Sequence, residues 1–167
     1  MGKIFEAAQY WVKAGIAVIP VKYRDKRPDA ALLPKDADGD FTWEPYQKRL
    51  PTMGELAQWF ASDLHNFGIV TGWQNLVVID FDDAGPYSQW ATWSTRLYRD
   101  NPYRANVIGL TYKVISARGK HVYFRLKQPE QNRKLPGIDI KARWGYVLGA
   151  PSIHPSGKDY EICQKGV

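Results

Sequence analysis

A short apolar run near the middle of the chain ends directly in acidic residues. Residues 76–79 are Leu-Val-Val-Ile, and Asp80, Phe81, Asp82 and Asp83 follow them. A run of this length and composition predicts a strand that is buried on both faces. Because side chains alternate along a strand, we expect Asp80 and Asp82 on one face, with their backbones roughly 7 Å apart, and Phe81 on the other. Carboxylates at this separation can bind the same one or two cations.

Three segments have the spacing and the end signals of helices. Residues 4–14 carry apolar side chains at helical spacing, and Gly15 suits the end of that helix. The Thr-x-x-Glu sequence that begins at Thr52 is a capping box, which predicts a helix to about residue 61. Pro86 suits the first turn of a third helix, whose apolar stripe ends before Asn101.

The other apolar segments are short and are typical of strands. The expected strands are residues 16–20, 67–71, 107–115, 121–126, 138–142, 146–148 and 159–163. A long polar connection, residues 21–50, follows the first of them, and a connection of this length inside a compact domain is usually functional or mobile. Its D-x-D-x-D sequence at residues 36–40 lacks the final Glu of a calcium loop, so we expect a solvated turn there.

Length and composition predict one domain with one core. The chain has 167 residues, of which 44% are hydrophobic and 24% are charged, as in ordinary globular proteins. No apolar stretch approaches the roughly 20 residues that span a bilayer, and the first residues do not have the layout of a secretion signal. The single Cys163 excludes an internal disulfide and a multi-cysteine zinc site. We therefore expect a cytoplasmic protein without a membrane partner.

The charge of the chain favours a polyanionic partner. Lys and Arg outnumber Asp and Glu by 23 to 17, which gives a net charge of +6. Seven Trp and ten Tyr residues make stacking on nucleic-acid bases possible, although packing in the core is the better explanation for most of them.

A second candidate element is a hairpin with basic residues. Residues 116–119 lie between two expected strands, and Gly119 permits close approach of another backbone. Alternation in the next strand places His121, Tyr123 and Arg125 on an outward face, with Val122, Phe124 and Leu126 on the core side. Together with Arg118 and Lys120, Arg125 would form a cradle for phosphates.

A third candidate element repeats the acidic pattern of the first. Ile138 and Ile140 are expected to face inward, with Asp139 and Lys141 facing outward. Asp is a poor strand former, so its occurrence on several expected strands indicates a function. Carboxylates on strands beside a basic, histidine-containing turn predict a cation site that faces a phosphate site, which is the usual apparatus of phosphoryl transfer.

The order of these features resembles the archaeo-eukaryotic primase superfamily, in particular the primase-polymerase domains of phages, plasmids and mobile elements. Ala150 stands where the family tail has a first Pro, and Arg118 precedes Gly119 where the family often has Gly-Gly. The matching segments are Gly15 to Pro20 with Lys26 to Pro28, Gly68 to Gly72, Asp80 with Asp82, Gly119 to His121, Asp139, and Pro151 to Gly157 with Tyr160 and Glu161.

The resemblance implies a mixed α/β (α+β) fold, in which an N-terminal module packs on an RRM-like unit and the active site lies between them. It implies that Asp80, Asp82 and Asp139 hold two Mg²⁺ or Mn²⁺ ions and that His121 contacts a nucleoside triphosphate. Further candidates for nucleotide binding are Arg118, Lys120, Lys141, Ser152 and His154, although His154 would equally well fix a turn. Candidates for contacts with the template backbone are Lys22, Arg24, Lys26 and Arg27, and a solvated loop explains these four equally well.

The same resemblance implies a DNA primase or DNA polymerase, within a longer replication protein of a bacterial or archaeal host cell. Its partners would be single-stranded DNA, ribo- or deoxyribonucleoside triphosphates, and a helicase in the same or a separate chain. The main alternative is a noncatalytic RRM-like module that binds single-stranded nucleic acid. It would not need three aspartates. An initiator endonuclease usually needs two histidines one residue apart, which His65, His121 and His154 do not provide. A D-x-D sugar transferase would explain neither the histidine turn nor the charge.

Overall fold

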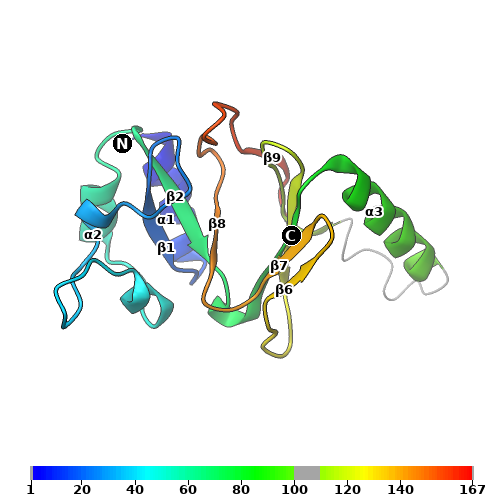
Figure 1. Cartoon of the computed structure of the whole chain (residues 1–167), viewed down its shortest axis with the longest axis horizontal. Helices are drawn as coiled ribbons and strands as arrows, with labels where there is room; N and C mark the ends of the chain where they lie inside the picture. The colour runs from blue at the N-terminus through cyan, green and yellow to red at the C-terminus, as the bar shows by residue number, and fades with distance from the viewer. Residues whose placement is uncertain (1, 100–109, 167) are drawn as a thin grey trace.

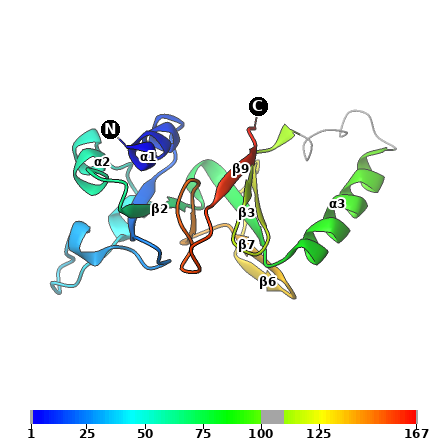
Figure 2. The same ribbon diagram turned by 90° about the horizontal axis from the view of Figure 1, so that it is seen from above.

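The computed structural model describes residues 2–99 and 110–166, which form two antiparallel sheets that lie side by side (Figures 1 and 2). The smaller sheet has the strand order β1-β2-β8 and carries α1 and α2. Its elements are α1 (Lys3–Lys13), β1 (Val18–Lys22), η1 (Ala30–Leu32), η2 (Glu44–Gln47), α2 (Met53–Trp59), β2 (His65–Val70) and β8 (Tyr146–Leu148).

The larger sheet has six strands in the order β6-β7-β3-β5-β4-β9. Within it, the order β7-β3-β5-β4 is that of an RRM-like unit, and α3 lies on the side away from α1 (Figure 2). The segment between β5 and β7 contains β6 in place of a second helix. The elements are η3 (Trp73–Asn75), β3 (Leu76–Phe81), α3 (Ala84–Arg99), β4 (Lys113–Ile115), β5 (Lys120–Arg125), β6 (Arg133–Leu135), β7 (Ile138–Lys141) and β9 (Glu161–Gln164). The mixed α+β architecture agrees with the prediction.

Both faces of the central strand β3 are covered, as its composition predicts. Leu76 and Val78 belong to the main core, which α1 shares by packing Trp11 against Tyr123 with ring centroids 5.5 Å apart. On the opposite face Phe81 is fully buried against α3, whose Trp90 lies 5.3 Å from it between ring centroids. The smaller sheet with α1 and α2 is called the smaller unit below, and the larger sheet with α3 the larger unit. The face that carries Leu76 and Val78 continues to Asp80, so the candidate site lies where the core between these two units ends.

The predicted outward face of β5 is wrong. His121 and Tyr123 are each only 3% exposed, while Val122 is buried on the other face of the same strand. Alternation along the strand is correct, but it cannot distinguish a solvent-facing side from a second covered side. Trp11 of α1 covers Tyr123, and Tyr160 of the tail after β8 packs against His121, so His121 is a buried histidine at the edge of the core.

Most element boundaries agree with the sequence patterns, and the differences are local. The first strand begins two residues later than expected, because the turn after α1, in which Gly15 has a φ of 77°, is followed by two residues, 16 and 17, that are not in regular structure. The expected strand at 107–115 is reduced to β4; residues 107–109 lie outside the described residues, and 110–112 are not strand. β6 was not predicted, because its residues are all exposed and show no apolar alternation.

The acidic segment at residues 36–40 forms a turn, as predicted. Asp36 Oδ1 accepts hydrogen bonds from the backbone N–H groups of Asp38 and Asp40, at 3.0 and 2.9 Å. Its carboxylate thus stabilises the turn itself.

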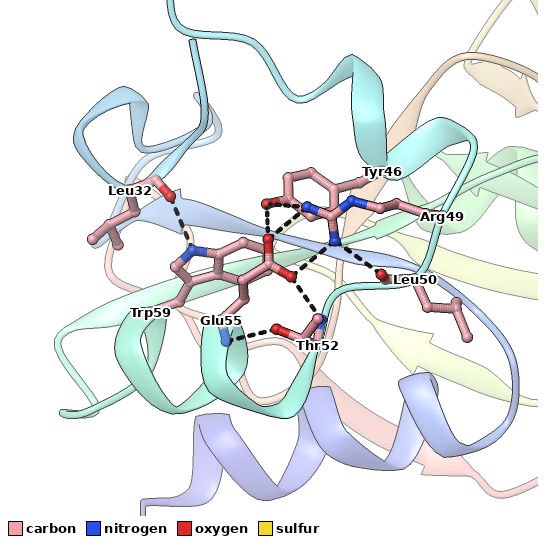
Figure 3. A network of polar contacts seen from close by, with 7 residues as sticks. All are labelled: Leu32, Tyr46, Arg49, Leu50, Thr52, Glu55 and Trp59. Carbon is pink, nitrogen blue, oxygen red and sulfur yellow. Dashed lines mark hydrogen bonds and ion pairs between the residues drawn. The ribbon is translucent and has the colours of Figure 1, made fainter.

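The predicted capping box at the start of α2 is part of a larger polar network (Figure 3). Thr52 Oγ1 accepts from Glu55 N at 3.1 Å, and Glu55 Oε2 accepts from Thr52 N at 2.7 Å. Arg49 donates to both carboxylate oxygens of Glu55, and the Tyr46 hydroxyl donates to Oε1 at 2.7 Å. The hydrogen bonds from Arg49, helped by those from Thr52 and Tyr46 and opposed by partial burial, lower the pKa of Glu55 from 4.5 to about 2.

Glu55→Gln is expected to destabilise the fold by about 1–2 kcal/mol at pH 7, since it removes a charged cap and a bidentate ion pair. A carboxyl whose pKa is lowered by folding stabilises the fold above its unfolded pKa near 4.5 and loses this effect as the pH falls towards 2. Urea unfolding at several pH values should therefore show the difference between the two proteins shrinking over this range. Glu44→Gln, which breaks only an exposed pair with Lys48, is the control and should change stability by less than about 0.5 kcal/mol. A pH-independent difference for Glu55→Gln would contradict the account.

Candidate active site

Three of the predicted site residues lie in one row across adjacent strands. Asp80 on β3 is directly opposite Asp139 on β7 and directly opposite His121 on β5. Directly opposed residues in antiparallel sheets have Cα atoms about 4.5–5.5 Å apart and side chains on the same face. Residues that are far apart in sequence are thus brought together by strand register, in the order Asp139, Asp80, His121.

A pocket opens beside this row, at the end of β3 where the chain turns into α3. The smaller unit contributes Lys26, and the turn between β4 and β5 contributes Arg118. The complete lining is Lys26, Asp80, Phe81, Asp82, Ser116, Ala117, Arg118, His121, His154 and Tyr160. The pocket is therefore formed by both units, as the resemblance implies.

Asp80 is held in its ionised form by basic neighbours. Its Oδ1 lies 3.3 Å from His121 Nε2. Burial alone would raise the pKa of the Asp80 carboxyl, but hydrogen bonding and charge from His121, together with the charges of Lys141 and Lys26, outweigh burial and hold this pKa below its ordinary value. The carboxylate of Asp80 thus stays ionised although its side chain is partly buried.

Asp139 has one paired and one unpaired oxygen. Its Oδ2 lies 2.9 Å from Lys141 Nζ, whereas Oδ1 is buried without a hydrogen-bond partner. A buried carboxylate oxygen normally has a donor or a cation beside it, and hard cations prefer such oxygens. Like charges opposite each other on neighbouring strands repel, so Asp139 and Asp80 also need the positive charge that surrounds them.

The donor chemistry of the row fits a divalent cation, but the donors are not yet gathered around one point. Across residues 2–99 and 110–166, no group of three His, Cys, Asp or Glu side chains is close enough to hold a metal as it stands. Asp82 is half exposed and lies 3.4 Å from Arg118 Nη2. Asp80, Asp82 and the unpaired oxygen of Asp139 are the groups that could bind a cation if their side chains converged on it.

Gly119 allows the basic turn to lie directly on the end of β3. The turn closes through Ser116 N donating to Gly119 O at 3.0 Å and Gly119 N donating to Ser116 Oγ at 3.1 Å. A Cβ atom at Gly119 would lie 1.9 Å from Phe81 O and 2.9 Å from Asp83 N. Only glycine permits this backbone approach, which sets Arg118 beside Asp82.

Two pocket residues come from the tail that follows β8. His154 borders the pocket, and its Nδ1 also lies 2.8 Å from Ser156 Oγ and accepts from Ser156 N, so it both fixes its turn and faces the site. Tyr160 is 4% exposed, and its ring lies 5.5 Å from that of His121. Tyr160 was not predicted as a site residue, although it lies in the tail that carries the family resemblance.

Other predicted site residues lie away from the pocket. Ser152 is fully buried, where its Oγ accepts from Phe67 N at 3.2 Å and joins the tail to β2. Lys120 lies on the opposite face of β5 from His121, with Nζ 4.2 Å above the Tyr87 ring. Lys141 is next to the row through Asp139.

The four basic residues predicted to contact the template lie in different surroundings. Of Lys22, Arg24, Lys26 and Arg27, only Lys26 lines the pocket. Arg27 is paired with Asp25 at 2.6 Å, while Arg24 lies beside Gly157 of the tail. Lys22 is exposed at the end of β1.

The fold and site define a mixed α+β protein with an acidic and basic pocket between two antiparallel sheets. The family model described as bifunctional DNA primase/polymerase, N-terminal, matches residues 7–166. The chain therefore belongs to this family, which confirms the resemblance of its motifs. A comparison with curated proteins finds no match. Among the described residues, none of the helices has the length and apolar character needed to cross a membrane.

Proposed function

We propose that the chain is a template-dependent nucleotidyltransferase that adds nucleotides to a 3′-hydroxyl and releases pyrophosphate. Membership in the DNA primase/polymerase family supports this activity in general. The observation that carries the specific proposal is the row of Asp139, Asp80 and His121, aligned by strand register on the face beside the pocket.

In this proposal Asp80, Asp82 and Asp139 hold Mg²⁺ or Mn²⁺. When bound, such ions supply charge neutralisation for the triphosphate and activation of the attacking hydroxyl. Asp139 offers Oδ1 for this purpose while Lys141 remains on Oδ2.

The basic residues of the pocket bind the triphosphate. Lys26 and Arg118 border the pocket from opposite units, so a triphosphate between them contacts positive charge on two sides. His121, which borders the same pocket, contacts the triphosphate in this proposal, where a positive partner would stabilise the charge that develops on the leaving pyrophosphate. A single-stranded DNA template and a nucleoside triphosphate are thus the proposed substrates. A helicase partner stays a prediction from the resemblance.

The test is extension of a labelled primer on a DNA template with deoxyribonucleotides. The chain should extend the primer with Mg²⁺ or Mn²⁺ and should stop when the cation is chelated, because the carboxylates alone cannot neutralise the triphosphate. Binding of the primed template without extension under any cation would instead favour the noncatalytic RRM-like module.

A further inference from the structure

A second pocket lies at the other end of β3, where the two units are joined by η3 and by the connection from β7 to β8. Both of these segments are at the bottom of Figure 1, opposite the turn between β4 and β5. The pocket has a volume of about 270 Å³. Its lining combines aromatic, basic, amide and hydroxyl groups, in particular Trp73, Trp144, Lys48, Arg143, Gln74 and Thr71, and none of the described residues that line it has a carboxylate.

Trp144 is the most unusual residue of this second pocket. Its side chain is 56% exposed, although a Trp ring gains much by burial. Its backbone has a φ of 53°, in the left-handed region that bulky residues rarely adopt. The Arg143 guanidinium lies 5.9 Å from the ring centroid. A strained backbone thus holds an aromatic face and a cation at the rim of the pocket, as functional sites often do.

Thr71 supplies independent evidence for a ligand. It is 3% exposed, and its Oγ1 is buried without a hydrogen-bond partner. Its backbone N–H is already used, since it donates to Gly145 O at 2.9 Å. An unpaired buried hydroxyl at the wall of a polar pocket is a group that a bound ligand can satisfy.

The remaining wall is rigid. Trp73 Nε1 donates to Tyr46 O at 2.9 Å, and Gln74 Nε2 donates to Gly15 O at 3.3 Å. These bonds fix η3 against the smaller unit, and Gln74 itself has a φ of 47°. Lys48 adds a positive charge to this wall, although its Nζ forms an ion pair with Glu44. The pocket is therefore preformed on one side and carries exposed Trp144 on the other.

We propose that this second pocket binds one nucleotide of a single-stranded DNA chain, with a base stacked on Trp144 and a phosphate beside Arg143. Stacking on an aromatic ring together with nearby positive charge is the common mode of binding for single strands. The absence of a carboxylate from the described lining suits a phosphodiester. Asp139, in the row beside the first pocket, and Arg143 are four residues apart, at most about 13 Å along an extended chain, so one strand of a few nucleotides can reach from this row to the second pocket. The inference rests on the proposed function only in taking DNA as the polymer.

The test measures binding of a fluorescent oligodeoxythymidine to the whole chain by anisotropy, without nucleotides or metal. Trp144→Ala should weaken binding by roughly 5- to 100-fold, the usual effect of losing one stacked base, while Trp144→Phe should retain most of the affinity. Arg143→Gln should reduce the slope of log affinity against log salt by about 0.7, because one phosphate contact is lost. Trp93→Ala is the matched control, since Trp93 is equally exposed on α3, and it should bind like the wild type.

Trp144→Gly keeps the test valid if the alanine variant folds poorly, because glycine suits the positive φ at this position. Equal affinities of Trp144→Gly and wild type, or no binding by wild type, would overturn the inference. If wild type extends primers while Trp144→Ala and Trp144→Gly bind normally, only this inference fails. If Trp144→Ala and Trp144→Gly bind weakly but wild type never incorporates a nucleotide, the inference stands and the proposed catalytic function fails.

Discussion

Asp139→Asn is expected to reduce nucleotide incorporation by about 10²- to 10³-fold, the scale of losing one group that stabilises charge in the transition state. The substitution keeps the shape of the side chain but removes the negative charge directly opposite Asp80. It also replaces the carboxylate oxygen that is buried without a partner. The measurement is the rate of single-nucleotide extension under single-turnover conditions, which reports the chemical step rather than product release.

The fold should survive this substitution. Loss of the ion pair with Lys141 is offset by relief of the repulsion between Asp139 and Asp80, each effect being on the order of 1 kcal/mol or less. Asp38→Asn, in the exposed turn before η2, is the matched control and should retain wild-type extension. Full activity of Asp139→Asn would show that Asp139 on β7 is not part of the active site.

Gly119→Ala is expected to destabilise the protein by about 3 kcal/mol and to lower extension by at least about 100-fold. The new Cβ would lie 1.9 Å from Phe81 O and 2.9 Å from Asp83 N. Both of these atoms belong to the backbone, which cannot rotate away as a side chain can. The turn between β4 and β5 must therefore lift from the end of β3 and carry Arg118 away from Asp82. Urea unfolding gives the stability change, and primer extension gives the change in activity.

Gly54→Ala is the control for this substitution. Gly54 lies in α2, where the nearest atom to an added Cβ is Thr52 Oγ1 at 3.8 Å. Alanine also favours the helix by roughly 0.5–1 kcal/mol, so stability should stay the same or rise. If Gly119→Ala behaves like Gly54→Ala, the close approach of the turn to β3 does not occur in solution.

That Asp80 and Asp82 border the same pocket was predictable because it depends on local rules. Leu76 and Val78 mark a buried strand, and alternation then places Asp80 with Asp82 and separates both from Phe81. The glycine of the basic turn was predictable for the same reason, since only Gly119 permits such a close backbone contact. These inferences need only the geometry of one strand and one turn.

The rest of the site depends on tertiary contacts that a sequence pattern does not contain. The face of His121 was assigned to solvent because alternation does not reveal which other segments cover that face. Lys26 reaches the pocket while its neighbour Arg27 pairs with Asp25, and nothing in the run of basic residues distinguishes the two. Tyr160 lies beside His121 only because the tail folds back over the larger sheet.

The strand β6 and the role of Ser152 were hard to predict for a different reason. β6 is wholly exposed and, among the described strands, pairs only with β7, so it has no apolar face to mark it. Ser152 has a residue type that suits a nucleotide site, but the fold uses its hydroxyl to join the tail to β2. In both cases partners distant in sequence, rather than local propensity, decide the structure.

The most direct test of the proposed nucleotidyl transfer compares the wild-type chain with a variant that carries both Asp80→Asn and Asp82→Asn. Extension of a labelled primer and binding of the same primed template would be measured on each protein with Mg²⁺ and with Mn²⁺. Wild type should extend the primer with at least one of these cations, whereas the variant should lose extension and keep its affinity for the template to within about threefold, because the carboxylates contribute no favourable contact to phosphates. Equal extension by the two proteins would contradict the account.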